Sequence, residues 1–137
     1  MSVIRHKGKT KFMYFPVTVS TAFSKDSLVS IGSAGTLIAS VDNEKNVLGV
    51  IRHAIASTDG DYATARSVEV EVPVEKNVIW EVDGTAATYV AADVGFEFGI
   101  SSSLLVDRTD TTNKVFRMTE FVSSSKIRGV FKFNGGY

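Results

Sequence analysis

The chain has 137 residues, with 15 Lys or Arg and 15 Asp or Glu, so its formal net charge at neutral pH is zero. This balance argues against a general nucleic-acid coat and against a polybasic membrane binder, because both need a surplus of cations. The chain has no cysteine and only two histidines, which excludes disulfides, thiol catalysis and a structural zinc site built from Cys and His.

The chain length is that of one ordinary domain. A chain of this size buries roughly two thirds of its unfolded surface and supports its own hydrophobic core. No apolar run approaches the roughly 20 residues that a membrane helix needs, and no apolar segment follows the charged start. We therefore expect a soluble protein with no membrane partner.

The residue composition favours strands. Val supplies 19 residues, Thr 12 and Ile 8, whereas Leu supplies only 5. β-branched side chains are typical of strands, and the low leucine content argues against a helical core. We predict an all-β protein.

In chain order, the first expected feature is a basic N-terminal arm, residues 1–11, which is too polar for a core and has no turn signal. A single β domain, residues 12–137, follows, and an alternative reading divides it into two small β lobes at about 12–82 and 83–137. We place short strands between Gly-, Asn- and Asp-rich turns at Phe12–Val19, Ser27–Ile31, Thr36–Val41, Val47–Ile55, Ser67–Val74, Asn77–Val82, Ser103–Val106, Val115–Val122 and Ile127–Phe133.

The pattern predicts a small β-barrel or β-sandwich of about nine short, mainly antiparallel strands. At most one short helix is expected, over Gly84 to Asp93, where four alanines gather. Gly95 to Gly99 is not a phosphate loop, because no Lys-Ser or Lys-Thr follows it, and its alternating aromatic residues indicate a further strand.

The clearest alternation is Val68 to Val74, where four valines face one side. Glu69, Glu71 and Pro73 face the other side. Because Pro73 has no N–H to donate to a neighbouring strand, this strand is expected at a sheet edge, which the two glutamates would protect from unwanted pairing.

Charge is distributed unevenly along the chain. Residues 1–25 carry five cations and no acid, and residues 59–97 hold nine acids and two cations. Residues 108–132 return to a net charge of +4. Two interpretations stay open: complementary contacts between copies or with a partner surface, and ordinary solvated faces that contribute little.

The sequence offers no convincing catalytic or metal-binding group. No G-x-S-x-G motif presents a serine, and alternation places His53 on the same face as Ile51 and Ile55, which indicates a packed histidine. His6 is expected to be exposed. Asp59-Gly60-Asp61 and the Asp107–Asp110 segment lack the spacing of a calcium loop and are typical of turns. We therefore expect no enzymatic activity, no metal and no cofactor.

Aromatic residues next to cations could indicate single-stranded nucleic acid binding. In Lys126–Phe133, however, alternation sends most of the rings and the charges to opposite faces. This separation favours core packing, and the acidic middle of the chain argues further against nucleic acid as a partner.

Three segments resemble the small β-barrel modules of tailed-phage head decoration, or capsid cement, proteins. They are Phe23 to Ile31, the Gly-led Gly35 to Ala39, and Val47 to Ile51, which contains Leu-Gly-Val. Ala92 to Gly99 and Arg128 to Lys132 are similar to a second β lobe of such proteins. The resemblance extends over residues 12–133.

The resemblance implies a non-enzymatic virion protein that decorates the outer surface of an icosahedral phage head. Its partners would be the major capsid protein and its own copies, commonly as homotrimers, with synthesis in the host cytoplasm. By charge and position, the arm residues Arg5, Lys7, Lys9 and Lys11 are the candidate capsid contacts. Alternatives are another structural β-domain of the virion or tail, and a small-barrel nucleic-acid-binding protein.

Overall fold

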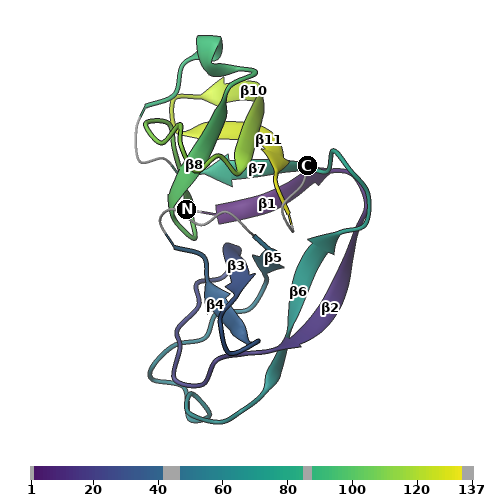
Figure 1. Ribbon diagram of the computed structural model, residues 1–137, viewed down its shortest axis with the longest axis vertical. Coiled ribbons are helices and arrows are strands. Elements are labelled where there is room, and N and C mark those ends of the chain that lie inside the picture. Colours follow the sequence, from purple (N-terminus) through teal and green to yellow (C-terminus); the bar gives the residue numbers. More distant parts are fainter. Residues whose placement is uncertain (1, 42–46, 85–87, 134–137) are drawn as a thin grey trace.

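The computed structural model describes residues 2–41, 47–84 and 88–133, and these residues form two β-sheets stacked along the long axis of the molecule (Figure 1). The upper sheet has the spatial order β1-β7-β11-β10-β8-β9. Its strands are β1 Ser2–Lys7, β7 Ile79–Asp83, β11 Lys126–Phe131, β10 Phe116–Ser123, β8 Glu97–Ser102 and β9 Leu105–Asp107.

The lower sheet has the order β2-β6-β5-β3-β4. Its strands are β2 Thr10–Pro16, β6 Ser67–Pro73, β5 Gly49–Ile51, β3 Ser27–Ile31 and β4 Leu37–Ala39. A bridge between Val17 and Leu37 joins the residue after β2 to β4, so the sheet curls into a half-barrel. Every strand pair in both sheets is antiparallel.

The all-β prediction is confirmed, with eleven strands among the described residues where about nine were expected. The helix expected over Gly84 to Asp93 is a single 3₁₀ turn, Ala91–Asp93, and residues 85–87 of that prediction lie outside the described residues. Of the alternating segment Gly95 to Gly99, only the last three residues lie in β8, and Gly95 and Phe96 precede the strand.

The first residues need a correction, because Ser2–Lys7 form a paired strand and not a free arm. β1 pairs with β7 from Ser2 to Lys7, with a register shift between Arg5 and Lys7. Val3 is buried in the core and provides the apolar contact that fixes the strand, and the next four residues, Ile4 to Lys7, are exposed. Polarity alone suggested an arm, but one buried valine and a neighbouring strand are enough for pairing.

β6 is a central strand, so the expected edge position is wrong. It lies between β2 and β5. Pro73 is the last residue of β6 and lies beyond the two residue pairs, at Glu71 and Val70, that join β6 to β5. Its missing N–H therefore interrupts no ladder, and the true edge of the sheet at this side is β2.

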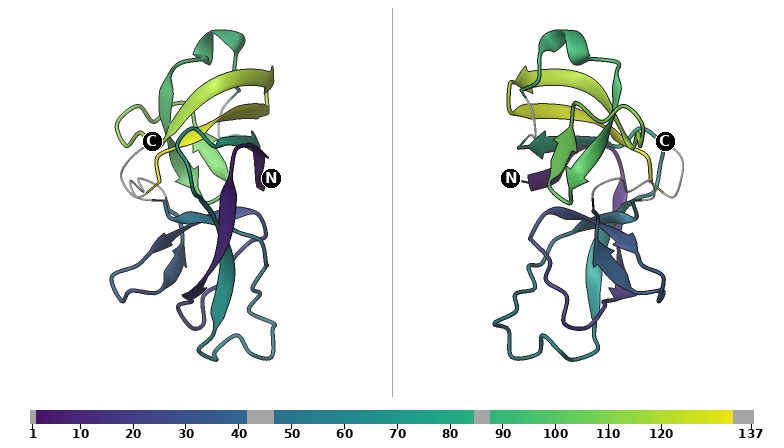
Figure 2. Two further views of the ribbon diagram at one scale, coloured as in Figure 1. Left: turned by 90° about the vertical axis from the view of Figure 1, so that its right-hand side faces the viewer. Right: turned by 60° about the vertical axis from the view of Figure 1, so that its left-hand side comes forward.

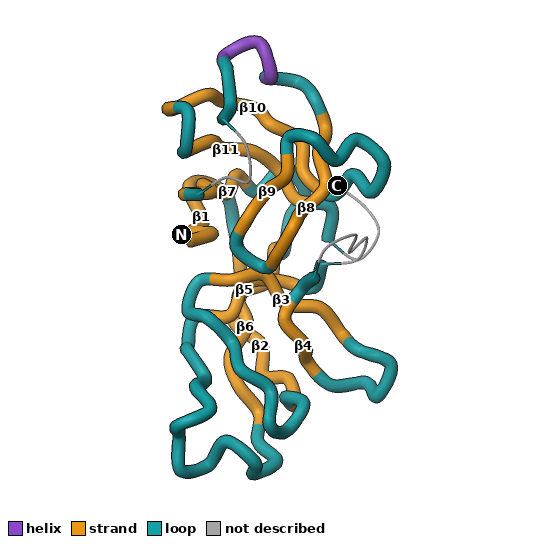
Figure 3. The backbone as a smooth tube through the Cα atoms, turned by 90° about the vertical axis from the view of Figure 1, so that its left-hand side faces the viewer, coloured by secondary structure: helices purple, strands orange, loops and turns teal. Residues whose placement is uncertain are grey.

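Two continuous segments connect the sheets, and we call them the β1–β2 ribbon (residues 2–16) and the β6–β7 ribbon (residues 67–83). β1 continues into β2 and β6 continues into β7, so a pair of strands runs from the lower sheet into the upper one (Figure 2). At the bend, Gly8 has φ +105°, and a Cβ there would lie 3.0 Å from the Cα of Val78, so both conformation and space require glycine. Loops make up the lower end of the molecule (Figure 3).

Each sheet has its own core. The larger one fills the upper half and includes Trp80, Phe116 and Phe131, and it is extended from below by Leu28 and Val50 of the lower sheet. The smaller one is enclosed by the half-barrel around Val29, Leu37, Ile51 and Val70. Because strands β3 and β5 contribute to both cores, we infer that the two sheets are packed as one body.

Candidate interaction surface

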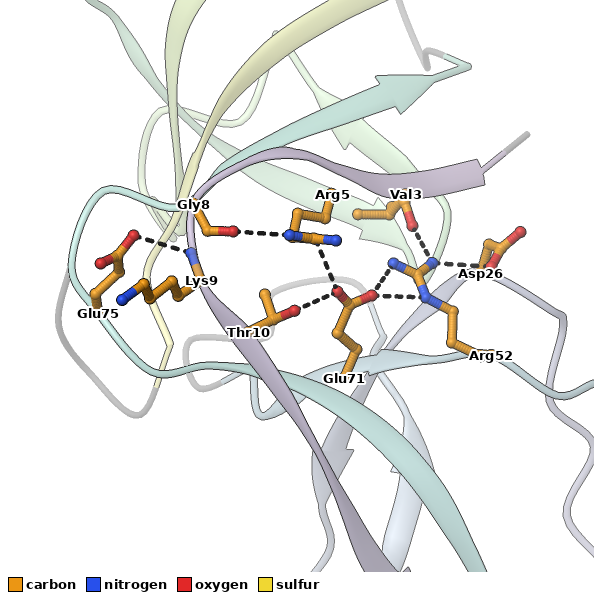
Figure 4. A network of polar contacts seen from close by, with 9 residues as sticks. All are labelled: Val3, Arg5, Gly8, Lys9, Thr10, Asp26, Arg52, Glu71 and Glu75. Atoms are coloured by element: carbon orange, nitrogen blue, oxygen red, sulfur yellow. Dashed lines mark hydrogen bonds and ion pairs between the residues drawn. The ribbon is translucent and has the colours of Figure 1, made fainter.

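A network of charged side chains lies where the two sheets meet, beneath β1 (Figure 4). Its centre is the guanidinium of Arg52, just after β5. Nε of Arg52 donates to Oε1 of Glu71 at 2.8 Å, and Nη2 forms an ion pair with the same oxygen. Nη1 donates to the backbone carbonyl of Val3 at 2.9 Å and to Oδ1 of Asp26 at 2.8 Å. One side chain thus links β6, β1 and the turn before β3.

Glu71 receives further donors from the β1–β2 ribbon. Nε of Arg5 lies 3.4 Å from Oε2 of Glu71, and the Thr10 hydroxyl donates to the same oxygen at 2.6 Å. Glu71 is only 4% exposed, so its charge depends on these partners. The guanidinium of Arg52 also lies 6.0 Å from the ring centre of the buried Trp80. The network joins the sheets.

An open depression of about 330 Å³ lies over this network. Ile4 and Phe12 form apolar walls, and Lys25 adds a cation beside the residues of the network. The carboxylates of Glu71 and Asp26 already have donors, so the depression offers a partner apolar contact and the exposed cations of Arg5 and Lys25. This composition suits the binding of a side chain of a partner protein.

β2 exposes large apolar side chains next to the depression. Phe12 is 54% exposed, Tyr14 68% and Met13 39%. The Tyr14 hydroxyl donates to Oε1 of Glu69 at 2.9 Å, and this hydrogen bond, together with the charge of the carboxylate, raises the pKa of Tyr14 above its usual value. Neighbouring exposed rings on one strand are typical of a contact surface.

The four candidate contact residues are distributed along the bent ribbon. Arg5 turns toward Glu71 and donates through Nη1 to the Gly8 carbonyl at 2.9 Å, with about half of its side chain exposed. Lys7, Lys9 and Lys11 are exposed, and none of them is ion-paired with a carboxylate of the described residues. Arg5 is therefore partly structural, whereas the three lysines project from the surface.

The prediction for His53 is wrong, and that for His6 is confirmed. β5 ends at Ile51, so the alternation does not continue, and His53 is exposed while Arg52 turns inward to the network. His6 is exposed on β1. Among the described residues, no three His, Cys, Asp or Glu side chains are placed to hold a metal ion, and no helix is long and apolar enough to cross a membrane.

The most constrained residues of the surface, Glu71, Arg52 and Asp26, were not found from the sequence. The valine alternation assigns Glu71 to a sheet edge, and no pattern in the sequence singles out Arg52 or Asp26. A signal existed: Glu71 lies in the middle of a valine strand whose flanking residues are core. What was missing was the identity of the neighbouring strands, which depends on contacts far apart in the chain.

A second charged pair, Asp93 and Arg108, lies between the 3₁₀ turn and the turn after β9. Nε of Arg108 donates to Oδ2 of Asp93 at 2.7 Å, and the Val90 N–H donates to the same oxygen at 2.9 Å. The hydrogen bond from Arg108 outweighs burial and lowers the pKa of Asp93, while Asp93 raises that of Arg108. Because the pair ties the 3₁₀ turn to the turn after β9, we assign it to stability.

Comparison with protein-family models, with curated proteins and with solved structures finds no match to the chain.

Proposed function

We propose that the protein is a non-enzymatic structural component of a tailed-phage virion that binds the outer surface of the icosahedral capsid as an oligomer and stabilises it. Its partners would be the major capsid protein and further copies of the chain, with a homotrimer as the expected assembly. The resemblance of the β segments to head decoration proteins motivates this proposal.

The observation that supports it best is the exposed ribbon of β1 and β2. Three lysines without a carboxylate partner among the described residues, Lys7, Lys9 and Lys11, lie along this ribbon. The exposed rings of Phe12 and Tyr14 lie on the face of β2 opposite Lys9 and Lys11. Exposed aromatic side chains lose contact with water on binding, and unpaired cations attract negative groups. Together they suit a partner protein of opposite charge. The ribbon is also fixed at its bend by Gly8 and by the network, so it is presented in one shape and loses little entropy on binding.

Decoration needs no reactive group. A protein that binds only the assembled shell stabilises that shell by mass action. Linking several weak sites through oligomerisation raises the effective concentration of each site and therefore the total affinity. A rigid β body with one adhesive surface is sufficient for this mechanism.

The test is a binding assay with heads that lack this chain, prepared from a deletion mutant of the phage that encodes it. The purified protein should sediment with the heads and raise the temperature at which they open. The variant Lys9→Glu/Lys11→Glu should lose at least tenfold in affinity. The control Lys114→Glu/Lys132→Glu, which changes the same charge on another part of the surface, should bind normally.

Mass spectrometry of purified virions can contradict the proposal in two ways. Absence of the chain from virions would overturn the proposal. Recovery of the chain with isolated tails and not with heads would replace it with the alternative, a structural β-domain of the tail. Light scattering of the purified protein would test the expected trimer.

A further inference from the structure

β2 has a free edge. In the lower sheet it pairs only with β6, and no strand of the described residues lies on its other side between Thr10 and Tyr14 (Figure 1). Just after β2, the backbone N–H of Thr18 donates to the Leu37 carbonyl, so the edge is paired there. The exposed part of the edge therefore precedes Pro16.

The direction of the free backbone groups follows from the ladder. Val17 donates to the Arg66 carbonyl at 3.0 Å, and Val74 donates to the Lys9 carbonyl at 3.1 Å. In an antiparallel pair these bonds recur at every second residue, so the odd-numbered residues of β2 face β6. The N–H and C=O groups of Thr10, Phe12 and Tyr14 consequently point outward, where they can pair with another strand.

Side chains on the two faces of β2 differ in chemistry. Phe12 and Tyr14 lie on one face, opposite Glu71 and Glu69 of β6. Lys9, Lys11 and Met13 lie on the other face, where β6 supplies only valines. The aromatic face has the carboxylates of Glu69 and Glu71, whereas β6 places no carboxylate beside Lys11.

The charges along this edge are unbalanced. Glu71 and Glu69 are satisfied within the protein, and Oε1 of Glu75 accepts from the backbone N–H of Lys9 at 2.9 Å. Lys9 and Lys11 have no ion-pair partner among the described residues, and neither has Lys25 in the adjoining depression. On the lysine face, an added strand therefore meets the positive charges of Lys9 and Lys11.

We propose that the free edge of β2, from Thr10 to Tyr14, accepts an extended acidic segment of a partner protein as an additional β-strand. Alternation fixes the pattern of that segment. Its apolar residues would lie beside Phe12 and Tyr14, and its acidic residues beside Lys9 and Lys11. The acidic residues of the added strand would thus lie on the face opposite to the glutamates of β6, which lie beside Phe12 and Tyr14. The assignment of the partner to the capsid rests on the proposed function, but the binding mode does not.

Two other occupants fit less well. Single-stranded nucleic acid would stack on Phe12 and Tyr14, but its phosphates would meet Glu69 and Glu71 on the same face. A second copy pairing through its own β2 would bring two sets of lysines together at one edge, which costs affinity. An acidic polypeptide meets neither obstacle.

The test uses the full chain and a short fluorescent peptide of alternating glutamate and valine, with a lysine-valine peptide as the charge control. Fluorescence anisotropy should show saturable binding of the acidic peptide only. Hydrogen exchange should show slower exchange of the Phe12 and Tyr14 amides when the peptide is bound. Lys9→Glu/Lys11→Glu should weaken binding at least tenfold, and Lys114→Glu/Lys132→Glu should leave it unchanged.

A pair of variants separates the backbone contribution from that of the ring. Phe12→Ala removes the ring, and Phe12→Pro removes the ring and the outward N–H without breaking a bond to β6. Phe12→Pro should therefore bind at least threefold more weakly than Phe12→Ala. Circular dichroism and urea midpoints should show that both variants remain folded, and a second proline variant, Tyr14→Pro, serves if the first does not fold.

Several results would overturn the proposal. They are the absence of binding at millimolar peptide, equal binding of both peptides, and binding that leaves the two amides unprotected. Tighter binding of oligothymidine would indicate nucleic acid, and protection of the amides with increasing protein concentration alone would indicate a second copy. If heads bind the protein and the peptide does not, only this inference falls; if the peptide binds and heads do not, only the capsid assignment falls.

Discussion

Replacing Arg52 should show that the junction between the sheets depends on a buried charge network. Arg52→Met removes the hydrogen bonds to Glu71, Asp26 and the Val3 carbonyl, and leaves a carboxylate that is 4% exposed. Removing one partner of a buried pair costs about 3–5 kcal/mol. Because Arg5 remains near Glu71 and Arg52 itself is partly exposed, we expect the lower end, about 3 kcal/mol.

The assay is urea unfolding at neutral pH, followed by far-UV circular dichroism and by the fluorescence of Trp80, the single tryptophan of the chain. With an m value of about 2 kcal/mol/M, the midpoint should fall by about 1.5 M. The control is Arg66→Met, which breaks a more exposed pair with Asp61 and should cost less than about 1 kcal/mol.

A double variant tests the reasoning further. Arg52→Met/Glu71→Met removes both charges, so it should be more stable than the sum of the single effects predicts, by about 2 kcal/mol. Strict additivity of the two substitutions would refute the argument, because it would mean that the charges do not depend on each other. A single-variant cost no larger than that of Arg66→Met would refute it as well.

Two further predictions concern the upper sheet. Gly129→Ala places a Cβ against the backbone carbonyl of the neighbouring strand β10, so it should destabilise by about 3 kcal/mol, whereas Gly60→Ala in open space should stay within about 0.5 kcal/mol of the wild type in the same urea assay. Asp93 has a lowered pKa in the folded protein because of Arg108, so its contribution is present above the ordinary carboxyl range and is lost as pH falls through the folded value. Asp93→Asn should therefore be less stable than the wild type at pH 7, with a difference that shrinks toward pH 3; a difference independent of pH would contradict this reasoning.

Strand formation was largely predictable from local sequence. Ser27 to Ile31 was predicted with the bounds that β3 has, and the alternation of Val68 to Val74 matches β6 within one residue. Alternation reports the two faces of a strand, and this information lies within a few residues. It does not report which strand is the neighbour, and this explains the errors for the first residues and for the edge assigned to β6.

The candidate surface was predictable only in part. Charge alone selected Arg5, Lys7, Lys9 and Lys11, and these residues do lie along one ribbon. Charge could not show that Arg5 turns toward a buried glutamate, nor that Phe12 and Tyr14 stand exposed on the opposite face of the same strand. Exposure of an apolar side chain depends on whether another segment covers it, and that is a property of the whole fold.

The sequence by itself determined that this protein is built of strands without cysteine chemistry, because residue type and alternation act locally. Tertiary structure alone decided that Glu71 is buried, that Arg52 joins two sheets and that β2 keeps a free edge. Each of these facts depends on antiparallel pairing between segments distant in the chain, and the free energy that selects such pairings comes from packing of the two cores rather than from any short stretch of residues.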